Sequence, residues 1–392
     1  MEAVKQSPKP SDRATALARR YVPALPTLWP NMLVGRRRWA PPFPFGADGA
    51  CFYYLARNAV WNAVKLLSLQ RREVLVPAYH HGVEIEALVD AGAIPRFYPV
   101  NLRMAIDPDD LARRLGPDTG AVYVIHYLGF PQALDPILEL CRARGIPLIE
   151  DCALALLSRD GDRPLGARGD VSIFCLYKTL PVPHGGALLV NGPWPRGVLR
   201  PLPPRVATTL SRAGSALLSN LELRAGRLGG WLARSLRAWG RAAATGLSLA
   251  RVPTGTQHFD RGQVRLGMAE LSNRIAENQD VERIVAIRRR NFFFLLGRLR
   301  EVAPPVLSEL PPGVCPLFYP LWAERKDVVL KRLRALGVEA IDFWRFGHPG
   351  VRPGEFEEVE RLRGHVVELP IHQDLTPDAM EFVSGAARQA LA

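Results

Sequence analysis

The stretch over residues 170–192 constrains the fold most strongly, because it reads as two strands joined by a tight turn. Residues 171–177 are apolar and β-prone, a pattern typical of a buried strand. Two prolines then fix φ within the turn, and the pair Gly185-Gly186 allows a close backbone approach. The sequence therefore predicts two strands of a buried sheet with a rigid connection between them.

Lys178 directly follows the first of these strands and has two interpretations. Its long stem can carry the amine out to water. Alternatively, a desolvated amine loses its proton near neutral pH and acts as a nucleophile. A second stretch, residues 145–158, favours the second interpretation, because a short apolar strand there ends in Glu150 and Asp151. Ligands of open α/β sheets bind beyond the carboxyl ends of the strands.

A lysine and a carboxylate at two such strand ends suit pyridoxal 5'-phosphate (PLP). The lysine binds this cofactor covalently, and the carboxylate keeps the ring nitrogen protonated, so that the ring accepts electrons. Lys178 and Asp151 are the predicted pair.

Five runs of sequence together resemble the DegT/DnrJ/EryC1/StrS family of PLP-dependent sugar aminotransferases. They are VLVPAYHHG, HYLGFPQ, PLIEDCA, YKTLPVPHGGALLVNG and ELPIHQDL. They follow the family order and lie between residues 50 and 385. The resemblance implies an α/β protein with the type I fold of PLP-dependent transferases. In this fold a mainly parallel sheet is flanked by helices, and a smaller α/β domain follows at the C-terminus. Strands alternating with helices along the chain favour the same parallel sheet.

The resemblance also implies a function. The expected enzyme transfers an amino group, with glutamate as donor, to a keto sugar, most simply a nucleotide-linked 4-keto sugar. The product would serve polysaccharide or secondary-metabolite biosynthesis, and the enzyme would be a homodimer. Lys178 would bind the cofactor and move the proton, and Asp151 would hold the ring nitrogen. Histidine replaces this lysine in the dehydratase branch of the family, so Lys178 argues against that branch.

Several further cofactor contacts follow from the same resemblance. The phosphate is expected at the start of a helix, where this chain has Ala56-Arg57-Asn58-Ala59 and where Asn58 and Ala59 would bind it. His81 occupies the position of a ring that lies flat against the cofactor, with Tyr79 or His80 as alternatives. Cys175 stands where one subgroup has a phosphate-binding serine. We predict no metal site, because His80 and His81 lack a third ligand nearby.

Other positions depart from the family pattern. Leu154 stands where the family has Gln or His to bind the phenolic oxygen of the cofactor, and Ile173 replaces a serine that binds phosphate in many members. The asparagine expected from the neighbouring subunit is missing, with Gln263 or Arg265 nearest. These departures support an alternative function: a catalytically weak relative that binds PLP or a sugar nucleotide as a scaffold at a membrane site of glycan assembly.

Composition along the chain predicts four regions. They are an N-terminal arm (1–44), a large cofactor-binding domain (45–200), a basic amphipathic helical segment (201–255) and a small C-terminal domain (256–392). The five cysteines are scattered without a CxxC pair, which indicates reduced thiols. No apolar run is long enough to span a membrane, and the start of the chain lacks the apolar core of a secretory signal. We therefore expect a cytoplasmic protein.

The basic segment carries eight arginines and one acid between residues 205 and 251. On a helical wheel, one face holds Leu228, Trp231, Leu232, Leu236 and Trp239, and the opposite face holds Arg227, Arg234, Arg237 and Arg241. Such a helix either lies on a membrane surface or packs on its own domain with a solvated basic face. We do not expect nucleic-acid binding, because no motif for it occurs.

Overall fold

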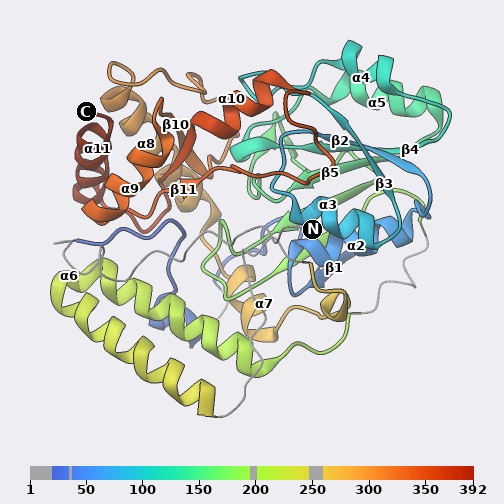
Figure 1. Cartoon of the computed structure of the whole chain (residues 1–392). Helices are drawn as coiled ribbons and strands as arrows, with labels where there is room; N and C mark the ends of the chain where they lie inside the picture. The colour runs from blue at the N-terminus through green and yellow to red at the C-terminus, as the bar shows by residue number, and fades with distance from the viewer. Residues whose placement is uncertain (1–19, 35–37, 195–200, 247–258) are drawn as a thin grey trace.

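The computed structural model describes residues 20–34, 38–194, 201–246 and 259–392. A seven-stranded sheet has the order β1-β9-β8-β5-β4-β2-β3, and a three-stranded sheet has the order β10-β12-β11 (Figure 1). β6 (Arg159–Asp160) and β7 (Arg163–Pro164) form a short ribbon. Residues 1–19 of the predicted arm and 247–255 of the predicted basic segment lie outside the described residues.

The large sheet is parallel over most of its width. Its strands are β1 (Ala50–Tyr53), β2 (Glu73–Pro77), β3 (Ile94–Tyr98), β4 (Thr119–Ile125), β5 (Leu148–Cys152), β8 (Val171–Cys175) and β9 (Gly186–Val190). The neighbours from β8 to β3 run parallel, whereas β9 is antiparallel to both β8 and β1. β5, β8 and β9 are buried along their whole length, as expected for strands covered on both faces.

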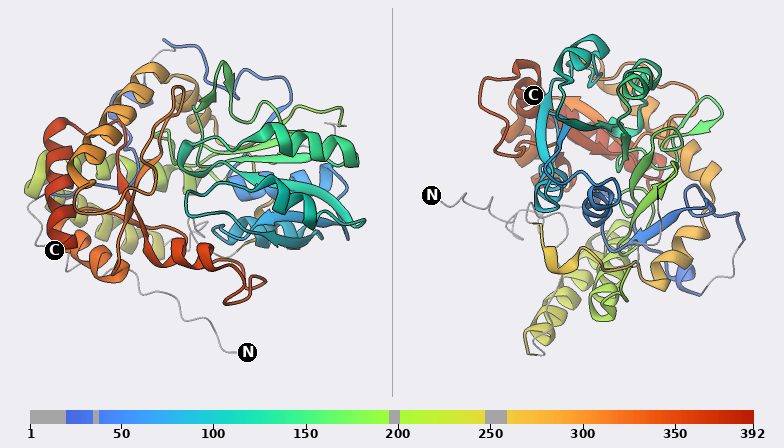
Figure 2. Two further views of the ribbon diagram at one scale, coloured as in Figure 1. Left: turned by 90° about the horizontal axis from the view of Figure 1, so that it is seen from above. Right: turned by 90° about the vertical axis from the view of Figure 1, so that its right-hand side faces the viewer.

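Along the chain, the helices of the large domain alternate with the strands of this sheet. They are α2 (Ala56–Leu66), α3 (Val83–Asp90), α4 (Pro108–Arg114) and α5 (Leu134–Arg144). Asp107 begins α4 by accepting hydrogen bonds from the amides of Asp109 and Asp110, with Pro108 at the first helical position. Figure 2 shows these helices beside the twisted sheet.

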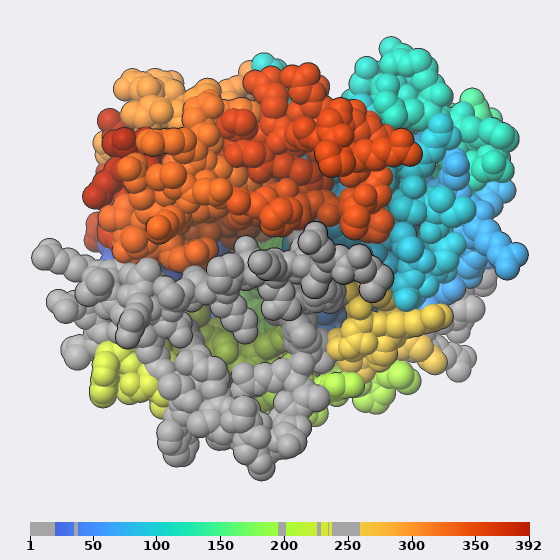
Figure 3. Space-filling model, viewed as in Figure 1, coloured from blue at the N-terminus to red at the C-terminus, as the bar shows by residue number. Residues whose placement is uncertain are grey.

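The small domain is an antiparallel sheet with helices packed against it. Its strands are β10 (Phe318–Trp322), β11 (Ile341–Asp342) and β12 (Val366–Pro370), and its helices are α8 (Val281–Leu299), α9 (Lys326–Leu336), α10 (Glu357–His365) and α11 (Pro377–Leu391). One apolar cluster continues from the large sheet into this domain, where it includes Phe318 and Phe343. Figure 3 shows the two domains in direct contact at the surface. The cavity described below lies at this junction.

α6 (Val206–Gly246) is a long helix that is only partly packed on the rest of the chain. In its first half, Asn220 donates to the hydroxyl of Thr27 at 2.8 Å, and the Arg224 guanidinium lies over the Trp29 ring. Farther along, Trp231 is 64% exposed. Leu232 and Leu236 are exposed as well. The apolar face of this helix, which the sequence placed either on a membrane or against the protein, is therefore exposed to solvent at Trp231, Leu232 and Leu236.

The remaining helices connect these parts. They are η1 (Pro30–Leu33), η2 (Tyr127–Gly129), η4 (Arg261–Gln263) and α7 (Glu270–Glu277). No helix among the described residues is long and apolar enough to cross a bilayer. All five cysteines are free thiols, as the sequence predicted.

Candidate active site

Four of the predicted site residues line one cavity of about 310 Å³: Lys178, Asp151, His81 and Cys175. The large domain supplies these side chains from the carboxyl ends of its strands and from the loop after β2. The small domain closes the opposite side with residues of β10, β11 and β12 and of the loop after β11. The cavity therefore joins segments that are far apart in the sequence.

Asp151 lies near the end of β5, beside Ile173 of the parallel neighbour β8. Its carboxylate accepts the Tyr123 hydroxyl at 2.6 Å and the Ala153 amide at 2.7 Å. Burial raises its pKa to about 6, with a contribution from the negative charge of Glu84, while the Tyr123 hydrogen bond and the charge of Lys178 oppose the shift. A cationic ring nitrogen beside this carboxylate would stabilise its charged form.

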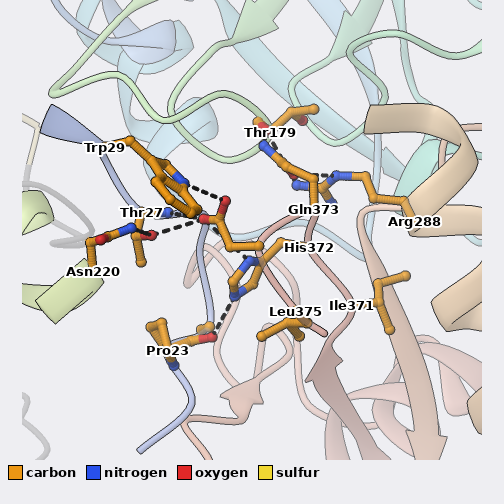
Figure 4. A network of polar contacts seen from close by, with 12 residues as sticks. Pro23, Thr27, Trp29, Thr179, Asn220, Arg288, Ile371, His372, Gln373 and Leu375 are labelled. Carbon is orange, nitrogen blue, oxygen red and sulfur yellow. Dashed lines mark hydrogen bonds and ion pairs between the residues drawn. The ribbon is translucent and has the colours of Figure 1, made fainter. Parts of the chain in front are cut away.

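Lys178 lies in the turn between β8 and β9, and the C-terminal segment holds that turn in place. The carbonyl of the next residue, Thr179, accepts the Gln373 side-chain amide at 3.0 Å and the Arg288 guanidinium at 3.3 Å (Figure 4). Arg288 also donates to Gln373 at 3.0 Å. These bonds fix the backbone beside the Lys178 amine.

The start of α2 lies directly against β9. Gly186 permits this approach, because a Cβ atom there would collide with the backbone nitrogen of Ala56. Leu55 precedes the helix and offers no side-chain cap, and Ala56 and Arg57 line the cavity. Amides at such a helix start, with the positive end of the helix dipole, are suited to a phosphate. The close backbone approach expected at the glycine pair is therefore made by a helix, at Gly186.

Two of the predicted phosphate contacts, Asn58 and Ala59, do not line the cavity. Asn58 turns away from the cavity, and its side-chain amide donates to the Gln263 carbonyl at 2.7 Å. Ala59 is fully buried in the core of the large domain. The helical rotation of about 100° per residue explains both placements, because the residues after Arg57 turn toward other neighbours before Val60 faces the cavity again.

Of the three candidate rings after β2, His81 is the one that lines the cavity. The two alternatives are used elsewhere. The His80 ring contacts the Pro77 carbonyl at 2.8 Å and accepts the His348 amide at 2.7 Å, and Tyr79 packs against Phe343. Burial and the charge of Lys178 lower the pKa of His81 to about 3, so its imidazole is neutral. Its Nδ1 is buried and has no hydrogen-bond partner in the described part of the chain, which leaves one polar atom available to a ligand.

The positions that depart from the family pattern also face the cavity. Leu154, Ile173 and Cys175 line it, so neither an amide nor a hydroxyl is present at these points. Burial raises the pKa of the Cys175 thiol, which keeps it neutral. Positive charge near the start of α2 comes from Arg57 and from Arg212 of α6, whose guanidinium lies 5.2 Å from the Tyr54 ring. Arg57 is close enough for its charge to lower the pKa of Arg212 in addition to burial.

Sequence reasoning missed Glu84, Tyr123 and the whole small-domain side of the cavity. Glu84 lines it, and one oxygen of its carboxylate accepts the His81 amide at 2.8 Å. Glu368 also lines it, in the middle of a buried strand. An acid inside an apolar strand was the available signal for Glu368, because such a residue is rare without a partner or a role.

One group of potential metal ligands occurs among the described residues, formed by His126, Glu150 and Cys152. The Glu150 carboxylate contacts His126 Nε2 at 3.0 Å and accepts the amides of Gly166 and Arg168 at 3.0 and 2.8 Å. These contacts occupy both oxygens of the Glu150 carboxylate. We therefore interpret His126, Glu150 and Cys152 as part of a structural hydrogen-bond network.

Comparison with solved structures shows the fold of this class of transferase. The aminotransferase TlmJ from Streptoalloteichus hindustanus matches with a TM-score of 0.62 and 24% identity, covering 90% of this chain and 92% of that one. The Helicobacter pylori aminotransferase PseC matches with a TM-score of 0.67 and 14% identity over 95% and 99% of the two chains. A GDP-4-keto-6-deoxy-D-mannose-3-dehydratase from E. coli with bound hydrated PLP matches with a TM-score of 0.59 and 16% identity, over 89% and 88%. The predicted type I fold is confirmed.

Sequence comparison identifies the family. Residues 56–195 match the DegT/DnrJ/EryC1/StrS aminotransferase family, in agreement with the resemblance found in the motifs. A GDP-perosamine synthase of Vibrio cholerae is 30% identical over 125 residues, which cover 31% of this chain and 34% of that protein. A dTDP-4-dehydro-2,3,6-trideoxy-D-glucose 4-aminotransferase of Saccharopolyspora spinosa is 34% identical over 34% of this chain and 36% of that protein. These matches thus span about a third of each relative's length.

A longer match is weaker. A dTDP-3-amino-3,4,6-trideoxy-alpha-D-glucose transaminase of Micromonospora megalomicea is 24% identical over 345 residues, or 85% of this chain and 83% of that protein. The predicted cofactor, PLP, is confirmed at the level of the family, since the dehydratase neighbour is described with it.

Proposed function

We propose that this protein is a PLP-dependent aminotransferase that acts on a nucleotide-linked keto sugar. The observation that carries the proposal is the placement of Lys178 and Asp151 in one buried cavity, at the ends of neighbouring parallel strands. The orphaned Nδ1 of His81 and the uncapped start of α2 make the cavity a good fit for an aromatic phosphate ester. The relatives described above are named as enzymes of nucleotide-sugar metabolism, which supports a sugar substrate for this chain.

Each residue has a defined task in this proposal. When bound, PLP supplies a carbonyl that reacts with amines and a ring that accepts electrons. The Lys178 amine holds the cofactor and then carries a proton to and from the reacting carbon. Asp151 keeps the ring nitrogen protonated, and His81 covers one face of the ring. The amides of Ala56 and Arg57 bind the phosphate. The mainly apolar lining of the cavity would limit competition by bulk water for the proton.

Labelling of Lys178 is the direct test of this function. Borohydride reduction of the cofactor-loaded protein should leave a pyridoxyl group on the Lys178 peptide, detected by mass spectrometry after digestion. A near-visible absorbance band should disappear at the same time. A label on another lysine, or none after reconstitution with PLP, would refute the assignment.

The finer parts of the proposal are the donor, the dimer and the location. We propose that glutamate is the amino donor. We also propose that the protein is a homodimer, in which other residues of the partner subunit complete the phosphate site, because the asparagine that the family uses there is missing. The five free thiols suit a reducing cytoplasm. A screen of keto-sugar nucleotides with the purified protein, with glutamate and glutamine as donors, identifies the substrates.

Membrane contact through α6 is a second proposal, supported by the exposure of Trp231, Leu232 and Leu236 on a segment rich in arginine. Membrane contact also suits the alternative role, in which the protein is a scaffold at a glycan-assembly site. The two roles can be distinguished by adding glutamate: an active aminotransferase would lose the visible absorbance band of its cofactor, and a scaffold would keep it.

The expected result is sedimentation with anionic liposomes that declines as salt rises. Each arginine near the surface contributes about 1 kcal/mol, screened over a Debye length. The double variant Trp231→Ser, Leu236→Ser should release the protein without unfolding it. Phe293→Ser removes a similarly exposed ring from α8 and should leave liposome binding unchanged. Binding that survives the α6 changes would contradict the proposal.

A further inference from the structure

Glu368 is the central acid of the small-domain wall of the cavity. Along β12 the side chains alternate between the two faces of the sheet: Val367 and Leu369 pack in the core of the small domain, whereas Val366 joins the cluster that extends from the large domain. Glu368 shares the face of Val366 by this alternation. A carboxyl group is therefore placed between the domains, where it lines the same cavity as Lys178.

One oxygen of the Glu368 carboxyl is buried and unpaired among the described residues. The residue is 3% exposed, and its Oε1 has no hydrogen-bond partner among the described residues. The nearby Lys326 does not fill this role, because its amine is taken by Asp342 at 2.6 Å and by the carbonyls of Arg363 and Phe343 at 2.8 and 3.1 Å. Burying an unpaired carboxylate is costly. Such a group is expected where a ligand completes its hydrogen bonds.

Aromatic side chains surround this carboxyl on the small-domain wall. Phe318, Phe343 and Trp344 line the cavity beside it. Trp344 has a φ of 44°, in the left-handed region that a bulky residue rarely adopts. Arg363 holds this conformation, because its guanidinium donates to the Trp344 carbonyl and also to the Ala78 carbonyl at 2.8 Å. Backbone strain that is held in place by its surroundings is concentrated at functional sites.

Aromatic faces beside a hydrogen-bonding carboxyl suit a hydroxylated ring. The C–H faces of a sugar are apolar and cover aromatic side chains, while its hydroxyls need a polar partner in a desolvated cavity. We propose that Glu368 is a specificity-determining residue that binds the hydroxyl groups of the substrate's sugar ring, with Phe318, Phe343 and Trp344 beside that ring. This proposal rests on the proposed function and names the part of the cavity that recognises the sugar.

The test separates the sugar from the rest of the ligand. Calorimetric titration of the cofactor-loaded protein compares a nucleotide sugar with its nucleoside diphosphate, using UDP-glucose and UDP, dTDP-glucose and dTDP, and GDP-mannose and GDP. The ratio of the two Kd values in a pair measures the contribution of the sugar. In the wild-type protein, at least one pair should show tighter binding of the nucleotide sugar.

Glu368→Leu should reduce that ratio about tenfold, the equivalent of one or two lost hydrogen bonds. The Kd of the nucleoside diphosphate and the PLP content should stay unchanged. Glu357→Gln, on the exposed side of α10, serves as a control that should alter neither value. An unchanged ratio in Glu368→Leu, or an equal loss for both members of the pair, overturns the proposal. So does a wild-type protein that binds no member more tightly than its diphosphate.

A second variant covers the case in which leucine prevents folding. Glu368→Gln keeps the shape and most of the hydrogen bonds but cannot titrate. The charged and titratable groups that share the cavity with Glu368 are Arg57, His81, Glu84, Asp151, Lys178 and Asp342, with Lys326 behind Asp342. Cys175 and Tyr177 also line it, and burial raises the pKa of both.

The pKa of Glu368 is raised by burial to about 8. The sugar contribution of the wild-type protein should therefore change between about pH 6 and 9, while that of Glu368→Gln should not. An identical pH dependence in both proteins overturns the proposal. Borohydride labelling of Lys178 remains intact in that case, which separates a failure here from a failure of the proposed aminotransferase function.

Discussion

Replacement of Lys178 by glutamine is expected to abolish amino transfer while leaving the protein folded. The variant keeps a side chain of similar length in the turn that Gln373 and Arg288 hold through the Thr179 carbonyl. It loses the amine that, in the proposed function, both binds the cofactor and moves the proton. General acid–base catalysis alone contributes about 10²–10⁴-fold, so kcat should fall by at least that factor. Steady-state assays with glutamate and the best keto-sugar nucleotide measure the loss.

The control for this change is Lys331→Gln, an exposed lysine on α9 that should keep full activity. Added ethylamine should restore part of the activity of Lys178→Gln, because a free amine can carry the proton in an otherwise intact cavity. Turnover near the wild-type rate in Lys178→Gln would show that another group performs the chemistry, and would refute the site as a whole.

The second large effect concerns stability and its dependence on pH. Burial raises the pKa of Glu368 from 4.5 to about 8, and the positive charges of Lys178 and Lys326 only partly oppose this. The folded protein therefore binds this proton more tightly than the unfolded chain does. The stabilisation that this bound proton gives to the folded state is therefore lost progressively as pH rises from 4.5 to 8. The full pKa difference corresponds to roughly 5 kcal/mol above pH 8.

Glu368→Gln removes that loss in the cofactor-free protein. The variant should match the wild type in free energy of unfolding below pH 4.5 and exceed it increasingly toward pH 8, where the difference levels off. Chemical denaturation at a series of pH values measures the difference, and Glu357→Gln should follow the wild-type curve. A constant difference across this range would mean that Glu368 has a hydrogen-bonding partner in the unliganded protein.

The sequence predicted the central part of the site because its signals are local. A buried strand followed at once by Lys178, and another ending in Asp151, define strand ends without knowledge of the rest of the fold. The parallel arrangement then requires that these ends meet, as β5 and β8 do. The position of His81 came from the resemblance to the family, by counting along the motif that follows β2.

Other parts could not be predicted because they depend on packing between distant segments. Asn58 and Ala59 lie on a helix whose rotation is set by contacts with residues such as Gln263, about two hundred positions away. Glu368 and Trp344 reach the cavity only because the small domain folds against the large one. The exposure of Trp231 likewise depends on where α6 leaves the body of the protein, which periodicity does not reveal.

The contacts in Figure 4 bear on the order in which the protein is made. Asp374, near the end of the chain, accepts the Thr27 amide at 2.6 Å and the Trp29 indole at 3.0 Å, and His372 contacts the Pro23 carbonyl at 3.0 Å. During synthesis the N-terminal segment therefore waits for these partners until residues 372–374 have left the ribosome. The same late segment secures the turn beside Lys178. A nascent chain thus completes this cavity only after residues 372–374 have emerged, and a chain stalled or shortened before them would expose apolar surface to chaperones and proteases.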